Sequence, residues 1–416
     1  MTTRAVVCTG LNEPWKTHEI DIDPPGFREI RVKMVYSGMC HSDEHLRSGD
    51  IGAPPEVLEM LGVPSMFPVV GGHEGSGIVT EVGDSVTQVA VGDHVAVAFI
   101  PACGTCHWCA SGRQNLCDLG MTTLVGGMIS DGTYRYHLGD ENLNRMAQLG
   151  TFADEMVCHE NSVVKIDPWV NMKAAALISC GISTGYGSAV DRAKVKGGET
   201  VVVVGCGGVG SGAIQGARIA GARYIIAVDP VPFKLEKAKE IGATHTAASL
   251  LDAQFMLPEL TQGRNADVVI LTPGVLHGDL IAAASAVGSK DARIVVTAIA
   301  PFHQMDVQLN LFNFAMNNQA LLGTIFGSVS PRVQVPNLLN LYEAGQLKID
   351  EIITQEYTLD QVQQGYDDQA AGTIIRGVVK FDTCSSGAEV PAESRRDDEV
   401  VRGQAVDAGV PETEER

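Results

Sequence analysis

The segment Val201-Val202-Val203-Val204-Gly205-Cys206-Gly207-Gly208-Val209-Gly210 decides the fold of this 416-residue chain. Its four consecutive valines predict a strand that is buried on both faces, and the small residues that follow up to Ala220 predict a helix. Between them stands a G-x-G-x-x-G turn, whose glycines let the backbone approach a pyrophosphate at the positive end of the helix. The segment therefore predicts the first strand-helix unit of a doubly wound, nucleotide-binding sheet.

The residues after this turn continue the same pattern. Residues 224–229, 266–271 and 293–298 predict further strands, the last two each after a helical segment, which extends a parallel sheet. Asp229 follows Gly210 by 19 residues, where an acid accepts both hydroxyls of the adenine ribose and repels a 2'-phosphate. Because residues 230–233 contain no arginine to bind such a phosphate, we expect NAD and not NADP.

The flanking sequence has a different character. Short β-rich runs at residues 31–35, 77–82 and 94–97 are broken by glycine and proline, which predicts an antiparallel or barrel-like domain. Near the other end, residues 334–345 predict an amphipathic helix and residues 377–381 a closing strand. The chain is thus expected to combine a β-rich part with an α/β part.

Composition limits the partners of this chain. Fifty acidic against thirty basic residues give a net charge of -20, which leaves no basic surface for nucleic acid or an anionic membrane. No apolar run approaches the roughly 18 residues of a membrane span, and no signal-peptide-like stretch follows Met1, so we expect a cytoplasmic protein with a small-molecule ligand. Residues 384–416 lack Leu, Ile, Phe, Tyr and Trp and are predicted to form a disordered acidic tail.

Four of the ten cysteines are regularly spaced. Cys103, Cys106, Cys109 and Cys117 read C-x2-C-x2-C-x7-C, and four thiolates at this spacing can close a tetrahedral shell around zinc or iron. A chance cluster of structural cysteines and a redox C-x-x-C pair are the alternatives. A closed shell leaves no position for a substrate, so we expect a structural site that staples residues 101–119, with backbone N-H groups offsetting its negative charge.

Three further segments contain residues that bind metals. Cys40 lies in Gly38-Met39-Cys40-His41-Ser42-Asp43, His73 in Gly71-Gly72-His73-Glu74-Gly75, and Cys180 in Ser179-Cys180-Gly181-Ile182-Ser183-Thr184-Gly185. Each alone is a weak signal, because an isolated His or Cys is usually a core residue. Together with the four cysteines and the glycine turn, however, they resemble the zinc-containing medium-chain alcohol dehydrogenases over residues 4–382.

This resemblance implies an α/β architecture with two domains. A GroES-like, β-rich catalytic domain would comprise residues 1–181 and 324–383, and a Rossmann NAD-binding domain would comprise residues 182–323. The active site would lie in the cleft between them. Two Zn²⁺ ions per subunit are implied: a structural one on the four spaced cysteines and a catalytic one on Cys40, His73 and Cys180.

The implied chemistry is the reversible oxidation of a primary alcohol to an aldehyde. The catalytic zinc keeps a fourth position open, where metal binding lowers the pKa of a hydroxyl from about 16 to about 7, and the alkoxide passes a hydride to NAD. In the family, residues matching Ser42 and His45 lead the proton to solvent. Asp43 and Glu74 match residues behind the zinc, although plain surface carboxylates are the alternative for both.

The resemblance also assigns contacts to the cofactor and the substrate. His41 and Arg376 would bind the pyrophosphate, Lys234 the adenosine, and Ile299 would lie beside the nicotinamide, while Phe99 would line the substrate channel. Lys234 and Arg376 read alternatively as solvated surface charges, and Phe99 and Ile299 as plain core. The remaining expected cofactor contacts are Thr184, Gly205, Gly207, Gly208, Val209, Gly210 and Asp229.

A finer resemblance concerns residues 228–234 and 330–360. They look closest to actinobacterial nitrosoaniline-dependent alcohol dehydrogenases, a group linked to the redox peptide mycofactocin, in which NAD stays tightly bound and an external acceptor reoxidises it. The motifs leave this nicotinoprotein type and turnover with free NAD both open, because both need the same contacts. The family also implies a homodimer or homotetramer.

Two other functions stay open as alternatives. A glutathione-dependent formaldehyde dehydrogenase is disfavoured, because residues 118–134 contain neither Lys nor Arg to pair with a glutathione carboxylate. A non-enzymatic NAD- or zinc-binding relative is disfavoured because the expected catalytic residues are all present. The segment between His45 and His73 is longer than in typical family members, and we expect this insertion to lie at the mouth of the cleft.

Overall fold

The computed structural model describes residues 1–52, 55–62, 64–122 and 126–382. The predicted acidic tail, residues 384–416, lies outside the described residues. Residues Met1–Asp382 form one compact unit that contains three sheets. No helix in the described residues is both long and apolar enough to cross a membrane.

The β-rich part of the chain contains two of the sheets. The first has the order β8-β7-β2-β1-β4-β9, and the second has the order β11-β6-β5-β3-β19-β18, with β10 also pairing with β3. The strands of the first sheet are β1 (Thr2–Cys8), β2 (Lys16–Ile22), β4 (Val69–Val70), β7 (Tyr136–Leu138), β8 (Glu141–Asn142) and β9 (Asn144–Arg145). Those of the second are β3 (Glu29–Gly38), β5 (Ser76–Val82), β6 (His94–Val97), β10 (Glu155–His159), β11 (Val163–Ile166), β18 (Ile353–Tyr357) and β19 (Arg376–Lys380).

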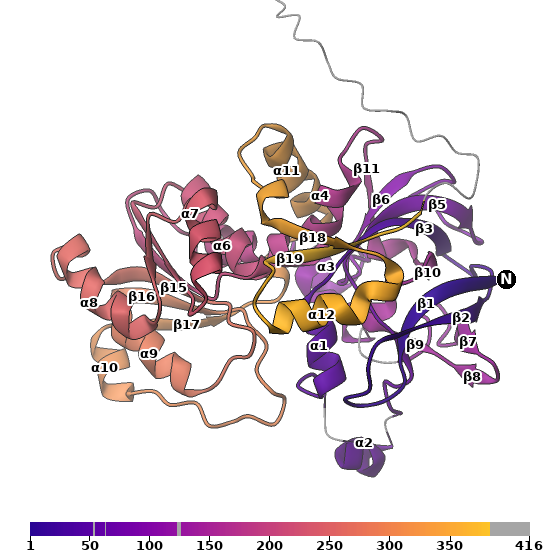
Figure 1. Cartoon of the computed structure of the whole chain (residues 1–416), viewed down its shortest axis with the longest axis horizontal. Helices are drawn as coiled ribbons and strands as arrows, with labels where there is room; N and C mark the ends of the chain where they lie inside the picture. Colours follow the sequence, from indigo (N-terminus) through magenta and orange to yellow (C-terminus); the bar gives the residue numbers. More distant parts are fainter. Residues whose placement is uncertain (53–54, 63, 123–125, 383–416) are drawn as a thin grey trace, which may run out of the picture. The chain divides into compact units, whose positions relative to one another are not determined.

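The C-terminal strands return to the N-terminal sheet. β19 pairs antiparallel with β3, with Val378 opposite Gly38, and β18 lies parallel to β19 on its other side. In Figure 1 the yellow C-terminal segment accordingly lies beside the indigo N-terminal strands. This pairing brings Arg376 to the end of β3, next to the segment that begins with Cys40.

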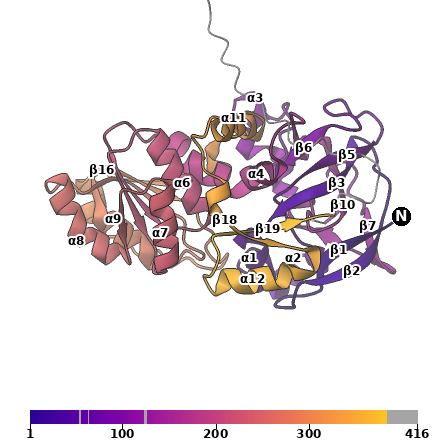
Figure 2. The same cartoon turned by 45° about the horizontal axis from the view of Figure 1, so that its top comes forward.

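The third sheet is entirely parallel, in the order β14-β13-β12-β15-β16-β17. Its strands are β12 (Thr200–Val204), β13 (Tyr224–Val228), β14 (His245–Ala247), β15 (Ala266–Leu271), β16 (Gly288–Val296) and β17 (Ala320–Gly323). Its helices are α6 (Gly208–Ile219), α7 (Pro232–Ile241), α8 (Leu250–Thr261) and α9 (Asp279–Val287). Figure 2 shows these helices around the sheet.

The valine strand explains why helices cover both faces of this sheet. Val201 and Val203 belong to the same core as residues of α6 and α7, whereas Val202 and Val204 belong to the core that contains residues of α8 and α9. Alternate side chains of a strand point to opposite faces, so a strand of consecutive valines needs an apolar cover on each side. The predicted fold class, a GroES-like β-rich part with a doubly wound Rossmann sheet, is confirmed, while the residue limits of the two domains stay a prediction.

The remaining α-helices lie between strands along the chain. They are α1 (His41–Ser48), α2 (Pro55–Leu61), α3 (His107–Ala110), α4 (Met172–Leu177), α5 (Ser183–Gly187), α10 (Leu311–Met316), α11 (Pro331–Glu343) and α12 (Val362–Ala370). Two predicted strands end early, β13 at Val228 and β16 at Val296. For β13 the reason is visible, because the Asp229 carboxylate accepts hydrogen bonds from the backbone N-H groups of Cys206 and Val231 and turns the chain.

Candidate active site

One cavity of about 830 Å³ collects most of the residues that the sequence singled out. It extends from the segment of Cys40 and His73 to the glycine turn and β13. Asp43, Glu74 and Gly210 do not line it: the two carboxylates are fully buried behind its wall, and Gly210 packs against Gly205 inside the turn. The predicted residues that do line it are Cys40, His41, Ser42, His45, His73, Phe99, Cys180, Thr184, Gly205, Gly207, Gly208, Val209, Asp229, Lys234, Ile299 and Arg376.

Three different local structures present the potential ligands of a catalytic metal. Cys40 is the residue just before α1, His73 follows the left-handed Gly72 (φ 88°), and Cys180 lies in a π-helical turn, Ile178–Ile182. Such single π-helical turns are frequent at functional sites. The side-chain ligand atoms of these three residues and of Glu74 all lie within 4.8 Å of one another, and all four residues are buried.

The contacts of His73 and the lowered pKa of Cys40 are those expected of residues that bind a metal ion. Asp43 Oδ2 lies 3.0 Å from His73 Nδ1, which leaves Nε2 as the nitrogen available to a metal, and buried Nε2 finds no hydrogen-bond partner among the described residues. A hydrogen bond from Cys180 lowers the pKa of the Cys40 thiol well below its usual value. Two thiol groups and one imidazole with a carboxylate behind it form the donor set of an open zinc site.

Glu74 and Arg376 form a buried ion pair next to this cluster. The Arg376 guanidinium donates to Glu74 Oε2, and the backbone N-H of Gly181 donates to Glu74 Oε1 over 3.0 Å. Burial raises the pKa of Glu74 to about 7, and Arg376 counteracts this. A side chain at Gly208 would overlap the Arg376 side chain, so Arg376 touches both the metal cluster and the glycine turn. The sequence singled out both residues without linking them.

Ser42, His45 and Asp50 lie along the route expected for the proton. Ser42 Oγ lies 3.6 Å from Cys40 Sγ, and His45 Nδ1 lies 2.9 Å from Asp50 Oδ2. Asp50 was not found from the sequence: α1 ends at Ser48, and the left-handed Gly49 (φ 85°) turns the chain so that Asp50 reaches back to His45. The Asp50 side chain is 26% exposed, which gives this pair access to solvent.

The nucleotide side of the cavity is shaped by its glycines. A Cβ atom at Gly210 would lie 1.9 Å from the Gly205 carbonyl oxygen, so the turn closes only with glycine there. A Cβ atom at Gly207 would meet nothing within 4 Å, which leaves open space beside the start of α6. The buried Thr184 hydroxyl lines the cavity without a hydrogen-bond partner in the described residues. An open helix N-terminus, an unpartnered hydroxyl and the Asp229 carboxylate fit a dinucleotide.

His41 and several wall residues complete the cavity. His41 Nδ1 lies 3.3 Å from Gln369 Oε1, a contact that no motif indicated. The Phe99 ring packs edge-on against His73 and Phe326, at 5.9 and 5.3 Å between ring centroids. The sequence also missed Met146 and Ala147, which line the cavity. Ile51 lines the cavity, whereas the described side chains of α2, those of residues 57–60, do not, so the placement of the insertion at the mouth stays a prediction.

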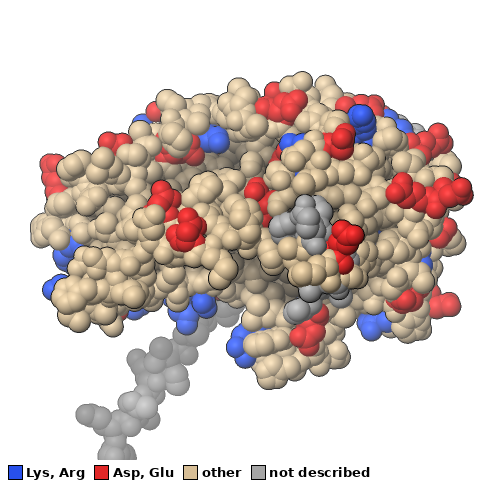
Figure 3. Space-filling model, turned by 90° about the horizontal axis from the view of Figure 1, so that it is seen from below, with Lys and Arg blue, Asp and Glu red and all other residues tan. Residues whose placement is uncertain are grey.

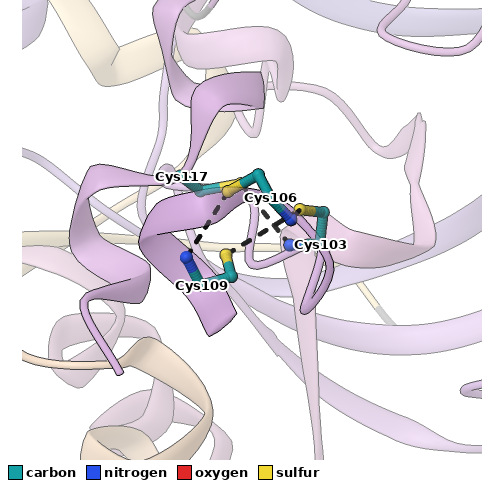
Figure 4. A group of neighbouring side chains, drawn as sticks. All are labelled: Cys103, Cys106, Cys109 and Cys117. Atoms are coloured by element: carbon teal, nitrogen blue, oxygen red, sulfur yellow. Dashed lines mark hydrogen bonds between the residues drawn. The ribbon is translucent and has the colours of Figure 1, made fainter. Parts of the chain in front are cut away.

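The four spaced cysteines converge in a separate lobe (Figure 4). Their sulfur atoms lie within 4.8 Å of one another, and backbone N-H groups point at them, from Cys106 to Cys103 Sγ over 3.3 Å and from Cys109 to Cys106 Sγ over 3.4 Å. Burial opposes ionisation of Cys103, but donors from Cys106 and Thr105 lower its pKa to about 6. This arrangement fits a closed four-sulfur metal site with partly neutralised charge.

Comparison with known proteins places this site in a family. Residues 26–168 match the model described as "Alcohol dehydrogenase GroES-like domain", and residues 208–344 match the one described as "Zinc-binding dehydrogenase". Alcohol dehydrogenase B of Mycobacterium tuberculosis is 44% identical, over 92% of this chain and 99% of that protein. The NDMA-dependent alcohol dehydrogenase of Amycolatopsis methanolica is 42% identical, over 91% and 99%.

A solved structure extends the likeness to the whole described fold. Benzyl alcohol dehydrogenase from Acinetobacter calcoaceticus superimposes with a TM-score of 0.82 at 27% identity, covering 92% of this chain and 100% of that one. Identity above 40% over nine tenths of the chain, together with both domain matches, shows the relationship. The chain therefore belongs to the family of alcohol dehydrogenases that combine a GroES-like domain with a zinc-binding dehydrogenase domain, on its actinobacterial branch.

Proposed function

We propose that this protein oxidises a primary alcohol to the aldehyde, reversibly, with zinc held by Cys40, His73 and Cys180 and with NAD in the same cavity. The observation that carries the proposal is the convergence of these three residues, Ser42 and the glycine turn on one cavity. When bound, zinc would supply a Lewis acid for the alcohol oxygen and NAD a hydride acceptor. We propose a second, structural zinc on Cys103, Cys106, Cys109 and Cys117.

The chain's own residues would orient the alcohol and remove its proton. Ser42 Oγ is placed to accept the hydroxyl proton beside Cys40. The Asp50 carboxylate accepts from His45 Nδ1, so Nε2 is the ring nitrogen that would take up the proton. Asp43 holds His73 in the orientation that presents Nε2, and the apolar Phe99 keeps water from this end of the cavity.

We also propose that NAD stays bound through turnover and that an external acceptor reoxidises it. The name of the Amycolatopsis relative, an NDMA-dependent enzyme, supports this proposal. Denaturing the purified protein should release about one NAD(H) per chain, and alcohol oxidation should require a nitrosoaniline acceptor such as NDMA and not added NAD. Turnover with free NAD by protein that retains no nucleotide would contradict the bound-cofactor proposal and leave alcohol oxidation intact.

Asp229 should select NAD, which can be tested by substitution. Asp229→Ala removes the acceptor for the adenine-ribose hydroxyls, and we expect NADH affinity to fall by about 100-fold, as for two lost hydrogen bonds to a charged group. Asp267→Ala is the matched control, because Asp267 also caps a backbone N-H, that of Thr200, at the opposite end of β12. Fluorescence titration of nucleotide-free protein measures both. Equal affinities in the two variants would show that Asp229 does not bind the ribose.

The partners that we propose are small molecules and a second copy of the chain. The face in Figure 3 shows acidic and basic side chains dispersed among uncharged ones. β17 is an edge strand, and Leu311, Phe312 and Met316 of the adjacent α10 are 72%, 72% and 66% exposed. An open strand edge beside exposed apolar side chains favours pairing between subunits as a homodimer or homotetramer, which sedimentation velocity of the full chain would measure.

A further inference from the structure

Arg145 is a buried cation with no carboxylate partner in the described part of the chain. It lies at the end of β9 and is 4% exposed, and no Asp or Glu oxygen of the described residues lies within 4.0 Å of it. Its guanidinium donates instead to backbone carbonyls of Gln148, Val157 and Gly127, at 3.0, 3.2 and 3.0 Å. Burying a charged group is costly unless its hydrogen-bond donors find acceptors. Carbonyl oxygens of the surrounding segments, and not an ion pair, are the acceptors of the Arg145 guanidinium.

The segment that Arg145 organises is a strained turn. Ala147 and Gln148 are consecutive non-glycine residues in the left-handed region, with φ of 53° and 63°. Arg145 holds the second of them twice, through the Gln148 carbonyl oxygen and through its side-chain Oε1 at 2.8 Å. Such conformations persist where the surroundings over-determine them, and they cluster at binding sites.

This turn forms part of the cavity wall near the metal cluster. Met146 and Ala147 line the cavity, and Phe99, whose ring contacts His73, packs against the same apolar core. A few residues later, the backbone N-H groups of Thr151 and Phe152 donate to the carbonyl oxygens of Gly72 and Gly71. These two hydrogen bonds fix the segment that leads into His73. The turn is therefore connected directly to the end of the cavity where the alcohol would bind.

We propose that Arg145 is a positioning residue that fixes the Met146-Ala147 wall and thereby sets which alcohols fit. The inference rests on the proposed function, because it takes this end of the cavity to be the alcohol site. A wall held in one strained conformation discriminates between substrates by size, whereas a relaxed wall yields to each of them. Arg145 would act through the conformation of this wall and would not itself contact the reacting atoms.

The test compares relative kcat/KM values over a series of straight-chain primary alcohols and benzyl alcohol, in the full-length holoenzyme. Arg145→Lys keeps the positive charge. The single ammonium group of lysine, however, cannot donate to all of these carbonyl oxygens at once, as the planar guanidinium of arginine does. We expect the ratio of kcat/KM between the best and the poorest alcohol to shrink by about tenfold, as for the loss of one shaping contact in an apolar pocket. Thermal stability and retained NAD(H) are measured in parallel.

Arg31→Lys is the matched control. Arg31 is also a buried arginine of the β-rich part, 5% exposed, but it pairs with Glu81 and Glu155 and does not line the cavity. It should lower stability and leave the alcohol ratio within about twofold of wild type. Gln148→Ala removes the side-chain oxygen that accepts from Arg145, and its effect on the ratio should not add to that of Arg145→Lys, because the two groups act as one unit.

The outcomes separate the two proposals. A wild-type enzyme that oxidises none of the alcohols overturns the proposed function. An active wild type whose alcohol ratio is unchanged in Arg145→Lys overturns the role of Arg145 alone. If Arg145→Lys does not fold, Gln148→Ala decides: a compressed ratio supports the positioning role, and a wild-type ratio contradicts it.

Discussion

Replacing Cys40 with serine is expected to lower kcat/KM for alcohol oxidation by about 10⁴-fold or more. The reason is that metal binding can shift the pKa of a hydroxyl from about 16 to about 7, which corresponds to roughly 12 kcal/mol of alkoxide stabilisation. A 10⁴-fold loss corresponds to about 5.4 kcal/mol, a little less than half of this stabilisation. The fold should survive, because Cys40 lies in the cavity wall and not in a hydrophobic core cluster.

Metal content distinguishes this effect from general damage. Metal analysis should find two zinc ions per wild-type chain and one in Cys40→Ser. Cys158→Ser is the matched control, because Cys158 is a fully buried free cysteine of β10 that lies away from both clusters. Its activity should stay close to that of wild type. A Cys40→Ser protein that keeps two zinc ions or substantial activity would refute the assignment of the catalytic metal.

Replacing Cys109 with serine should have the largest effect on stability. Binding of structural zinc to a four-cysteine site contributes on the order of 10–16 kcal/mol to folding of small domains, and opening the shell forfeits much of it. The residues around the cysteines offer little apolar core as compensation, since the buried members of the small hydrophobic cluster here are, among the described residues, Ile100, Cys109, Cys117 and Phe326. We expect Tm to fall by about 10 °C, corresponding to a few kcal/mol.

The unfolding should begin in the lobe and extend to the cavity. Asn115 Nδ2 donates to the Ile325 carbonyl oxygen over 3.3 Å, and Ile325 and Phe326 line the cavity, so a loosened lobe should also impair activity. Arg113 is exposed in the lobe and should become a rapid site of tryptic cleavage in Cys109→Ser. One zinc ion should remain. Retention of two zinc ions together with wild-type Tm would show that the four sulfurs do not bind a metal.

Local spacing explains what could be predicted without a structure. The valine strand, the glycine turn and Asp229 are separated by fewer than 30 residues, and a strand-helix-strand unit fixes their geometry. The four cysteines lie within 15 residues of one another, so their spacing alone allows convergence on one ion. Cys40, His73 and Cys180 were different: each segment was uninformative alone, and only the family resemblance combined them.

Contacts between residues far apart in the chain could not be predicted, because local spacing says nothing about them. Glu74 and Arg376 are 302 residues apart, and their pairing depends on β19 returning to β3. The Arg145 contacts depend on a left-handed turn of Ala147 and Gln148, a conformation that no residue type at these positions indicates. Asp50 lies only five residues from His45, but an ordinary turn sequence does not reveal which way the carboxylate points.

The sequence by itself determined the doubly wound sheet, the acid that would select NAD and the grouping of four cysteines, because each depends on residues held together by local chain geometry. Only the tertiary structure decided which side chains share the cavity, how Arg376 connects Glu74 to the glycine turn, and what Arg145 holds in place. These contacts arise when strands from both ends of the chain pack against a common core, and the free energy that selects that packing is distributed over the whole molecule.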